Sequence, residues 1–422
     1  MKKIILLGGS AQQVIAIDTA KKMGLYTVLC DYLPDNPGRY HADKFYQIST
    51  TDKKAVLQVA RDEVIDYIIA YASDPAAPTA AYVAEMMGLP TNPYKAVETL
   101  CNKDMFRGFL KSHGFDTPKA IGFQSKKRAV ANIEDFLFPI IIKPVDSSGS
   151  KGATVLRDTT GLDEAIDFAF SFSRSHRIII EEFIEKKHPY LIGGDIFVSD
   201  GKVIQWGLMN CHRDSSVNPL VPVGKSYPPI LDPFDLQAVK DTLQRLVTEL
   251  GVKFGPMNVE LIVDANNRVF PIDIGPRSGG NMIPDLLGMI FNCDVVEMSV
   301  RAAMGQDIGK QMGDGVPYYA TLNLHSDRDG IFEAVEFTPE IKQYIIRENI
   351  YKKAGDEVHF FSNAAHALGI VFFKFPDEHT MIDMENNMNE NVKISLGGGY
   401  YLLIKTRVFA LAYCNSDERW AA

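Results

Sequence analysis

Buried strands alternate with amphipathic helices over the first 93 residues. Short runs dominated by apolar residues occur at Ile4–Leu7, Tyr26–Cys30 and Tyr67–Tyr71, and helical patterns lie between them. Strands without polar alternation are typical of a parallel sheet that is covered on both faces. The pattern therefore predicts a βαβ series that forms an α/β domain over residues 1–95.

The pattern changes after a helical connection over residues 96–116. Pro139–Val145 predicts a strand, Gly152–Leu156 its hairpin partner, and Arg177–Phe183 a further buried strand. A helix that packs on this sheet is predicted by apolar residues at helical spacing, namely Leu162, Ala165, Ile166, Ala169 and Phe170. We therefore expect a smaller α+β domain over residues 117–184.

An antiparallel-rich domain is predicted over residues 185–305. Asp200-Gly201 between two apolar runs is typical of a tight hairpin turn. A long helix that ends at Gly251 is indicated by its apolar face, formed by Leu236, Val239, Leu243, Leu246, Val247 and Leu250. The rest of the chain, residues 306–422, mixes short strands and helices, and it carries no chemical signal up to and including the tail 397–422.

Composition and charge exclude several classes of protein. The chain has 422 residues, of which 46% are hydrophobic and 23% charged, as in ordinary globular proteins. Its formal charge of −9 argues against a general nucleic-acid surface, although a local anion site remains compatible with it. No apolar stretch approaches the ~20 residues that a membrane helix needs. Five dispersed cysteines favour a reducing compartment, so we expect a cytoplasmic protein.

A glycine-rich turn, Gly8-Gly9-Ser10, follows the first predicted strand, and Asp31 ends the second. This placement is typical of a dinucleotide fold, but the third glycine of G-x-G-x-x-G is missing. A nicotinamide-dependent oxidoreductase therefore remains an alternative, while a turn that lets a helix pack on a strand is the better interpretation.

A phosphate site is indicated by the loop Asp146–Gly152, which consists of small residues and one lysine between two predicted strands. Such a loop can fold its N–H groups around an anion, but it can equally be a flexible hairpin. Lys143 lies in the preceding apolar strand, where a buried ammonium needs an anion. Its partner is either a nearby carboxylate or a phosphate, and the loop beside it favours phosphate.

A metal site is indicated by two carboxylates on neighbouring predicted strands, Asn258–Asp264 and Val269–Ile274. A symmetric loop centred on Asn266-Asn267 sets Asp264 opposite Val269 and Glu260 opposite Asp273. Two facing carboxylates without a cation on their face favour a divalent ion, unless a bulge breaks the register. Pro276-Arg277-Ser278-Gly279-Gly280 follows at once and adds a guanidinium and a second loop of small residues.

In their order along the chain, these features resemble the ATP-grasp superfamily of carboxylate–amine ligases, from about Lys3 to Ala303. The layout is most similar to the L-amino acid ligases and the carbamoyl-phosphate-synthase-like ligases. The resemblance implies an ATP-grasp fold, α/β and α+β in class: a Rossmann-like pre-grasp domain, a small subdomain with a glycine-rich flap, a large subdomain with the metal site, and a C-terminal α+β addition.

The resemblance also implies roles for individual residues. Lys143 and Arg277 would serve catalysis, the latter by steadying the acyl phosphate, and Glu260 and Asp273 would hold the metal. The ATP-binding set would comprise Lys103, Lys143, Ser148, Gly149, Ser150, Gly152, the hinge Glu181, Glu182, Phe183 and Ile184, and His188. The substrate-binding set would comprise His212 and Arg213, expected in a polar loop, with Arg277, Ser278, Gly279 and Gly280.

Three positions depart from the pattern of the superfamily. His188 stands where many relatives have an acid for the ribose hydroxyls. The usual Glu-x-Asn-Pro-Arg is here Asp273-Ile274-Gly275-Pro276-Arg277, in which Asp273 is shorter than glutamate and Gly275 offers no ligand. We therefore expect metal binding with more water ligands, and one of two expected ions could be lost.

The resulting expectation is a magnesium-dependent ligase that uses ATP, with manganese as an alternative metal. ATP activates a carboxylate, expected to be that of an amino acid, as an acyl phosphate, and an amine then displaces phosphate to form an amide. The amine could be a second amino acid, an amino sugar or a sugar nucleotide. The alternatives are a carboxyphosphate-forming synthetase of the carboxyaminoimidazole-ribonucleotide or carbamoyl-phosphate type, and a nucleotide-binding module without catalysis. The resemblance also suggests a homodimer, with neither a nucleic-acid nor a membrane partner.

Overall fold

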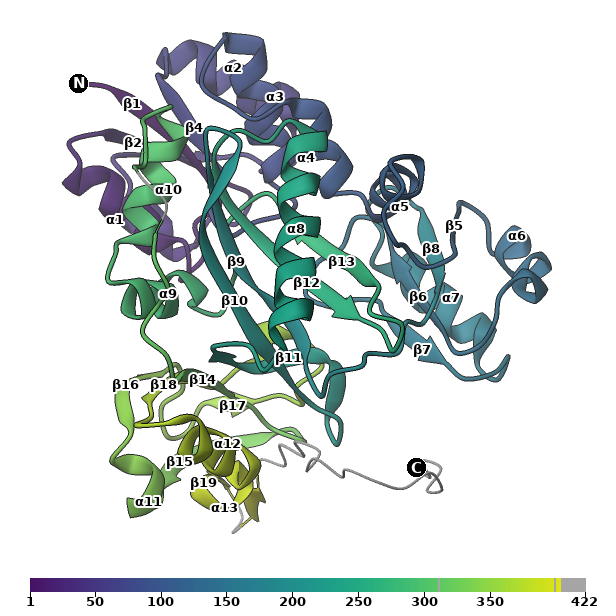
Figure 1. Cartoon of the computed structure of the whole chain (residues 1–422). Helices are drawn as coiled ribbons and strands as arrows, with labels where there is room; N and C mark the ends of the chain where they lie inside the picture. The colour runs from purple at the N-terminus through teal and green to yellow at the C-terminus, as the bar shows by residue number, and fades with distance from the viewer. Residues whose placement is uncertain (310–311, 398–399, 404–422) are drawn as a thin grey trace. The chain divides into compact units, whose positions relative to one another are not determined.

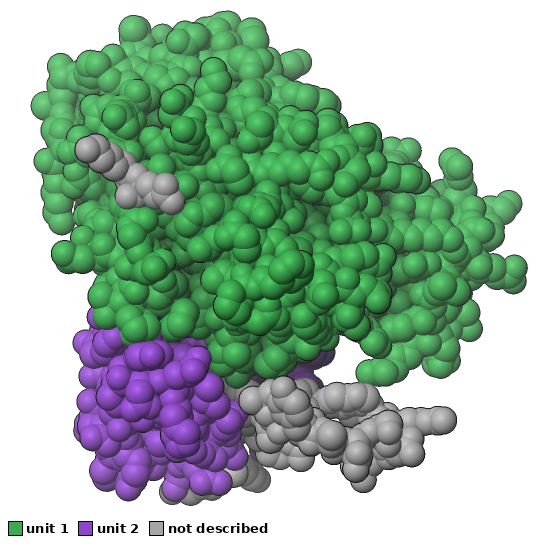
Figure 2. All heavy atoms as spheres, viewed as in Figure 1, with its two compact units in different colours: residues 1–211, 227–317 green, residues 212–226, 318–422 purple. Residues whose placement is uncertain are grey.

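The computed structural model describes residues 1–309, 312–397 and 400–403, which divide into two units (Figure 2). Unit 1 comprises residues 1–211 and 227–317, and unit 2 begins with residues 212–226 and continues from residue 318. All the predicted site residues except His212 and Arg213 lie in unit 1.

The predicted parallel sheet forms the first part of unit 1 (Figure 1). Its strand order is β3 (Lys44–Gln47), β2 (Tyr26–Asp31), β1 (Lys3–Leu7) and β4 (Tyr67–Ile69), and every pair is parallel. The connections contain α1 (Val14–Lys22), η1 (Pro37–Tyr40), α2 (Lys53–Glu63) and α3 (Ala77–Met87). The edge strand β3 has no buried residue, which explains why no apolar run predicted it.

The glycine-rich turn after β1 is closed by the chain's own side chains. The Gly9 N–H donates to Asp31 Oδ2 at 2.8 Å. The Gln13 amide Nε2 donates to the carbonyls of Leu7 at 3.2 Å and Tyr71 at 2.8 Å, and a Cβ on Gly8 would overlap this amide. Because Gln13 fills the turn, the packing interpretation is favoured over a dinucleotide phosphate site.

Two helices, α4 (Tyr94–Leu100) and α5 (Lys103–Ser112), lead to the small subdomain. Its antiparallel sheet has the order β5 (Ala120–Phe123), β8 (Ile178–Glu182), β6 (Ile140–Pro144) and β7 (Thr154–Leu156). α6 (Lys126–Ala131), η2 (Ile133–Asp135) and α7 (Leu162–Ser171) complete it. The predicted hairpin and helix are confirmed, because β6 pairs with β7 and the apolar face of α7 is buried in one core with the sheet.

The large subdomain contributes the strands β13 (Val269–Gly275), β12 (Gly255–Val263), β9 (Leu191–Ser199) and β10 (Lys202–Asp214), in that order. The predicted hairpin between β9 and β10 is confirmed, with Asp200 and Gly201 both at positive φ. The predicted helix is α8 (Pro233–Leu250), capped by Asp232 and ended by left-handed Gly251, and it covers one face of these strands (Figure 1). α9 (Ile283–Phe291) and α10 (Val295–Ala303) follow.

The β12–β13 hairpin has two compensating irregularities. Its loop is one residue longer than the symmetric loop we expected, so Val263 rather than Asp264 lies opposite Val269. A bulge at Ile272 adds one residue to β13, and the register returns to the predicted one at Glu260 and Asp273. The predicted pairing of these two carboxylates is therefore confirmed, while the predicted pairing of Asp264 is wrong.

Unit 2 is α+β and has its own core. Strands β11 (Asn218–Tyr227, of which Tyr227 belongs to unit 1), β14 (Tyr319–Leu324), β18 (Gly369–Lys374) and β16 (Ile345–Ile350) are neighbours in this order. A second sheet has the order β17 (Glu357–Val358), β15 (Gly330–Phe337), β19 (Val392–Leu396) and β20 (Tyr400–Leu403). The helices are α11 (Pro339–Lys342), η3 (Ala364–His366), α12 (Glu378–Asn386) and α13 (Met388–Asn391). Among the described residues of both units, no helix has the length and hydropathy that a membrane span requires.

Candidate active site

Lys143 on β6 is buried, and its partner is a carboxylate. Its Nζ lies 2.8 Å from Glu181 Oε2 on the neighbouring strand β8. Arg107 on α5 donates to the same carboxylate from Nε at 2.8 Å and from Nη2 at 3.3 Å. Burial would raise the pKa of Glu181, but the charges of Arg107 and Lys143 outweigh it and lower that pKa to about 2. Burial lowers the pKa of Lys143, against the opposing effect of Glu181.

This triad has a net charge of +1, because two cations surround one carboxylate. Glu181 thus holds Lys143 in place without neutralising the cluster. An incoming phosphate would find a positive charge at the end of β6, next to the glycine-rich loop. In the protein without ligand, the partner of Lys143 is therefore a carboxylate, which is one of the two alternatives that the sequence left open. The prediction that Lys143 binds phosphate stays compatible with this arrangement.

Lys103, the first residue of α5, lies between the small and large subdomains. Its Nζ is 3.2 Å from Asp273 Oδ2 and donates to the carbonyl of Ser147 at 3.1 Å. Burial would lower the pKa of Lys103, but Asp273 and Asp74 outweigh it and raise that pKa. Lys103 therefore ties the start of the glycine-rich loop to the predicted metal ligand. The neighbouring positions on the same sheet face supply no cation, as predicted, and this lysine comes from another element.

The two predicted metal ligands lie side by side on β12 and β13. The Asp273 side chain is about half exposed. Partial desolvation by the surrounding protein would raise the pKa of Asp273, yet the charges of Lys103 and Lys143 keep it below its ordinary value, so this carboxylate is ionised at neutral pH. Among the described residues, no cluster of three or more histidine, cysteine or acidic side chains could hold a metal by itself. Two carboxylates fit Mg²⁺, which is usually bound by one or two carboxylates together with waters and substrate phosphates.

Arg277 follows β13 and is fixed on both edges of its guanidinium. Its Nε donates to Asp74 Oδ1 at 2.7 Å, its Nη2 contacts Asp74 Oδ2, and its Nη1 donates to the carbonyl of Ser278 at 3.0 Å. Asp74 lies in the loop between β4 and α3 of the first domain. Gly275 makes room for this contact, because a Cβ at that position would overlap Asp74 Oδ1.

The glycine-rich loop joins β6 to β7 as predicted. Gly149, Ser150 and Gly152 all have positive φ, and such conformations allow a loop to turn successive N–H groups toward an anion. A Cβ on Gly152 would lie 2.9 Å from Phe172 Cβ, whereas Gly149 has open space around it. Ser148 belongs to the same loop. A side chain at Gly149 would thus meet no neighbour, while Gly152 packs against Phe172 at the end of α7.

The remaining loop of small residues lies against the large subdomain. The Ser278 hydroxyl is buried and lies 3.3 Å from that of Ser299 on α10, and the Gly279 N–H donates to Asp195 Oδ2 at 2.7 Å. Gly280 adjoins this segment, next to Gln12 of the first domain. These contacts fix the loop in place, so two of its polar groups already have protein partners.

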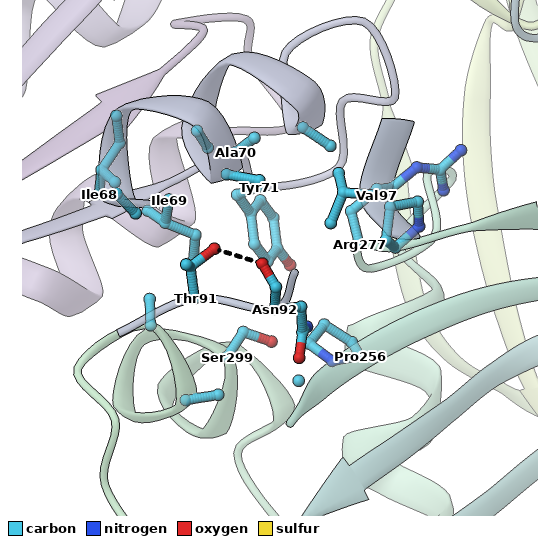
Figure 3. A pocket seen from close by; sticks show the side chains of 18 of the residues that line it. Ile68, Ile69, Ala70, Tyr71, Thr91, Asn92, Val97, Pro256, Arg277 and Ser299 are labelled. Atoms are coloured by element: carbon cyan, nitrogen blue, oxygen red, sulfur yellow. Dashed lines mark hydrogen bonds between the residues drawn. The ribbon is translucent and has the colours of Figure 1, made fainter. Parts of the chain in front are cut away.

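A pocket lies beside this loop, between the first domain and the large subdomain (Figure 3). Alanines of α3 and α10 form much of its wall, and Tyr71, Ser278 and Ser299 also line it. Arg277 lies at its edge with the guanidinium directed away from it (Figure 3). The pocket is thus mainly apolar and adjoins the charged cluster.

The predicted hinge begins at the end of β8. The Glu182 N–H donates to the carbonyl of Lys119 and the Phe183 N–H to that of Pro139, both at 2.9 Å. Ile184 follows directly, before His188. His188 Nε2 lies 2.8 Å from Asp235 Oδ2 on α8, and Lys187 Nζ lies 2.8 Å from the same oxygen. A fully buried carboxylate therefore fixes the histidine that the resemblance places at the ribose.

His212 and Arg213 differ from our expectation. They lie within strand β10, not in a polar loop, because β10 continues to Asp214. His212 is buried and contacts Ser226 Oγ at 2.9 Å and Glu385 Oε1 at 3.4 Å, and Arg213 donates to the carbonyl of His212. Both belong to unit 2, whereas Arg277 belongs to unit 1. The alternation of the strand was obscured because almost all of its residues are buried.

Sequence reasoning missed three charged residues of the site, namely Asp74, Arg107 and Asp235. Arg107 had a usable signal, since it adjoins Phe106 and lies three residues from Leu110 on the buried side of α5. Asp74 had none, because its partner Arg277 lies 203 residues away.

Comparison with known proteins places this geometry in a family. Residues 102–311 match the family model described as carbamoyl-phosphate synthase L chain, ATP binding domain. A curated relative, formate-dependent phosphoribosylglycinamide formyltransferase of Pelobacter propionicus, is 25% identical over 79% of this chain and 82% of its own. The uncharacterized protein y4rH of Sinorhizobium fredii is 24% identical over 61% of this chain, which spans only about half (53%) of that relative.

Solved structures share the fold over nearly the whole chain. L-amino acid ligase from Bacillus licheniformis superposes with a TM-score of 0.77 at 18% identity, covering 94% of this chain and 99% of that one. The biotin carboxylase domain of 2-oxoglutarate carboxylase from Hydrogenobacter thermophilus, solved with MgADP and bicarbonate, gives a TM-score of 0.71 at 16% identity, covering 95% and 91%.

The fold and the charged cluster define an ATP-grasp protein. Within that class, the match to the carbamoyl-phosphate synthase L chain ATP-binding domain covers residues 102–311, about half of the chain. The predicted superfamily, its class of C–N ligases, the ATP-grasp fold, and ATP with Mg²⁺ as cofactors are confirmed at the level of this superfamily.

Proposed function

We propose that the protein is an ATP-dependent carboxylate–amine ligase. ATP phosphorylates the carboxylate of an amino acid to give an acyl phosphate and ADP, and an amine then displaces phosphate to form an amide. The observation that carries the proposal is the convergence of Lys103, Lys143, Asp273 and Arg277 beside a glycine-rich loop, at the junction of three subdomains.

Each group has a physical task in this reaction. Lys143 and Lys103 would offset the charge of the ATP phosphates, and the loop Ser148–Gly152 would cover the γ-phosphate and exclude water. Glu260 and Asp273 would hold Mg²⁺, which neutralises phosphate charge when bound. The hinge Glu181–Ile184 and His188 would hold the nucleoside. Arg277 would orient the carboxylate and stabilise charge that develops on it.

His212 and Arg213 remain proposed substrate contacts on the strength of the resemblance alone. The names of the relatives support the general reaction, since they include a formate-dependent formyltransferase and an amino acid ligase. They leave the choice of carboxylate and amine to experiment. A homodimer likewise remains a proposal.

The test is ADP release from MgATP with single amino acids, pairs of amino acids and bicarbonate, and with mass spectrometry of the products. Hydroxylamine serves as a general amine, because it converts an acyl phosphate into a hydroxamate whatever the natural acceptor is. We expect ADP and hydroxamate with at least one amino acid. Bicarbonate-dependent ADP release without amino acid would favour the carboxyphosphate-forming alternative, and MgATP binding without any turnover would indicate a binding module.

Two variants test the site. Glu260→Ala and Arg277→Ala should each abolish turnover, because the first removes a proposed metal ligand and the second the proposed carboxylate contact. Arg301→Ala is a matched control, since Arg301 pairs with Glu297 on the half-exposed surface of α10. Near-normal turnover in either site variant would contradict the assignment.

A further inference from the structure

Asp74 is a charged residue of the site to which the proposed function gives no task. Its carboxylate takes both Nε and Nη2 of Arg277, the edge of the guanidinium with which arginine binds carboxylates. The other edge donates to Ser278. Asp74 therefore lies where a carboxylate ligand of Arg277 would bind.

The pair is accessible to a ligand. The side chains of Asp74 and Arg277 keep 21% and 14% of their exposure, so neither is sealed in the core. The pair also stands close to the reacting groups, because Asp74 Oδ1 packs against Gly275, two residues after Asp273, whose carboxylate contacts Lys103. Two cations, Lys103 and Arg277, are here balanced by two anions, Asp273 and Asp74.

This balance restricts the kind of carboxylate that Arg277 can accept. A simple anion such as formate, acetate or bicarbonate would bring a second negative charge to a guanidinium that Asp74 already neutralises. The negative charges of the incoming anion and of Asp74 would then repel each other. An α-amino acid carries an ammonium group next to its carboxylate. Its carboxylate can bind the guanidinium of Arg277 while its ammonium group binds the carboxylate of Asp74. Binding of the amino acid therefore leaves the net charge of the site unchanged.

We propose that Asp74 is a specificity residue that holds the ammonium group of an α-amino acid whose carboxylate is bound by Arg277. The proposal rests on the proposed function and names its substrate class: zwitterionic amino acids in preference to carboxylates of the same size without an amino group. Gly275 is part of the device, because only a residue without Cβ lets Asp74 reach Arg277.

The test compares two pairs of substrates that differ only in the ammonium group, glycine with acetate and L-alanine with propionate. Hydroxamate formation gives kcat/KM for each, and isothermal calorimetry in the presence of a non-hydrolysable ATP analogue gives affinities independently of turnover. The variants are Asp74→Asn, which removes the charge but keeps the shape, and Gly275→Ala, which displaces Asp74 but keeps its charge. Asp264→Asn is the control, since it breaks an Asp–Arg pair with Arg268 on the β12–β13 loop.

We expect the wild type to prefer the amino acid in each pair. A charge-assisted hydrogen bond is worth enough for Asp74→Asn to lower that preference about tenfold to a hundredfold. Gly275→Ala should shift it in the same direction, and Asp264→Asn should not. A role of Asp74 that is only structural would lower the melting temperature and leave the ratio unchanged.

A preference that stays within twofold in both variants would overturn the proposal. If the wild type turns over acetate and neither amino acid, ATP-dependent activation of a carboxylate stands and the assignment of Asp74 fails. If it turns over bicarbonate alone, the carboxyphosphate-forming alternative replaces the proposed function, and the assignment of Asp74 fails with it. If no carboxylate is turned over, the proposed function fails, and calorimetry then decides on Asp74: equal affinity for L-alanine in wild type and Asp74→Asn refutes it.

Discussion

The buried carboxylate of Glu181 contributes both to the stability of the small subdomain and to the protonation of Lys143 in the proposed phosphate site. Glu181→Gln tests both contributions. Glutamine keeps the shape of the side chain but removes the charge that Arg107 and Lys143 share. The Glu181 side chain is only 3% exposed, so water cannot replace it. Removing one partner of a buried ion pair typically costs about 3–5 kcal/mol of unfolding free energy.

The pKa of Glu181 gives a second, independent value for this loss of unfolding free energy. Its folded value of about 2 lies below the ordinary 4.5, which corresponds to about 3 kcal/mol. Because the folded pKa is lowered, this contribution is complete above pH 4.5 and is lost as the pH falls from 4.5 toward 2. Glu181→Gln should therefore destabilise the protein by about 3 kcal/mol at pH 7 and by progressively less below pH 4.5.

The same substitution affects Lys143. Burial already lowers the pKa of this lysine, and Glu181 is the group that opposes the effect. Without Glu181, the charge of Arg107 also disfavours protonation, so the pKa of Lys143 falls further. We expect ATP affinity in Glu181→Gln to weaken more steeply with rising pH than in the wild type.

The assays are urea unfolding followed by circular dichroism at pH 7 and at steps down to pH 4, and calorimetric titration of MgATP from pH 6 to pH 9. Glu297→Gln is the control, because its carboxylate pairs with Arg301 on the half-exposed surface of α10 and is not part of the proposed ATP site. A loss below 1 kcal/mol in Glu181→Gln at pH 7, or equal pH profiles of ATP affinity in wild type and variant, would refute the reasoning.

Three further predictions concern the neighbouring groups. Asp273→Asn should raise the Mg²⁺ concentration for half-maximal turnover about tenfold or more, because a neutral amide is a weaker ligand than a carboxylate; an unchanged Mg²⁺ titration would exclude Asp273 as a ligand. His188→Ala should raise KM for ATP severalfold with little change in kcat, since it removes one hydrogen bond to the nucleoside; steady-state kinetics with varied ATP would show it, and a loss in kcat alone would speak against a ribose contact. Gly152→Ala should destabilise the loop by about 1 kcal/mol or more, because its φ of +75° and the nearby Phe172 leave no room for a Cβ; normal resistance of the loop to limited proteolysis would contradict this.

Much of the fold was predictable from local patterns. The buried strands of the first domain, the β9–β10 hairpin and α8 all follow from apolar periodicity together with Asp200-Gly201 and Gly251. The edge strand β3 escaped because its residues are exposed, and the inner end of β10 escaped because an almost wholly buried strand shows no alternation. A strand can be predicted from its sequence when buried apolar residues alternate with exposed polar ones. Neither β3 nor the inner end of β10 shows this alternation.

The site was predictable where its members are neighbours along the chain, and less so where they meet only in the fold. Lys143 and Asp273 stand out because a charge in an apolar run requires a partner. The partners themselves, Glu181 for Lys143 and Lys103 for Asp273, come from other elements and could not be paired by spacing. Asp74 had no signal at all, since it lies in an ordinary turn and its importance depends on Gly275 in a distant strand.

The bulge at Ile272 has a consequence for how the β12–β13 hairpin can change over evolution or by design. The loop sets the alignment of the outer pairs, and the bulge resets it before Glu260 and Asp273. The metal-facing end of the hairpin is thereby insulated from the length of its turn. A one-residue deletion in the loop can be absorbed by losing the bulge, and both carboxylates would keep their places. Turn length in this hairpin is thus free to drift, while the alignment of the carboxylate pair is not.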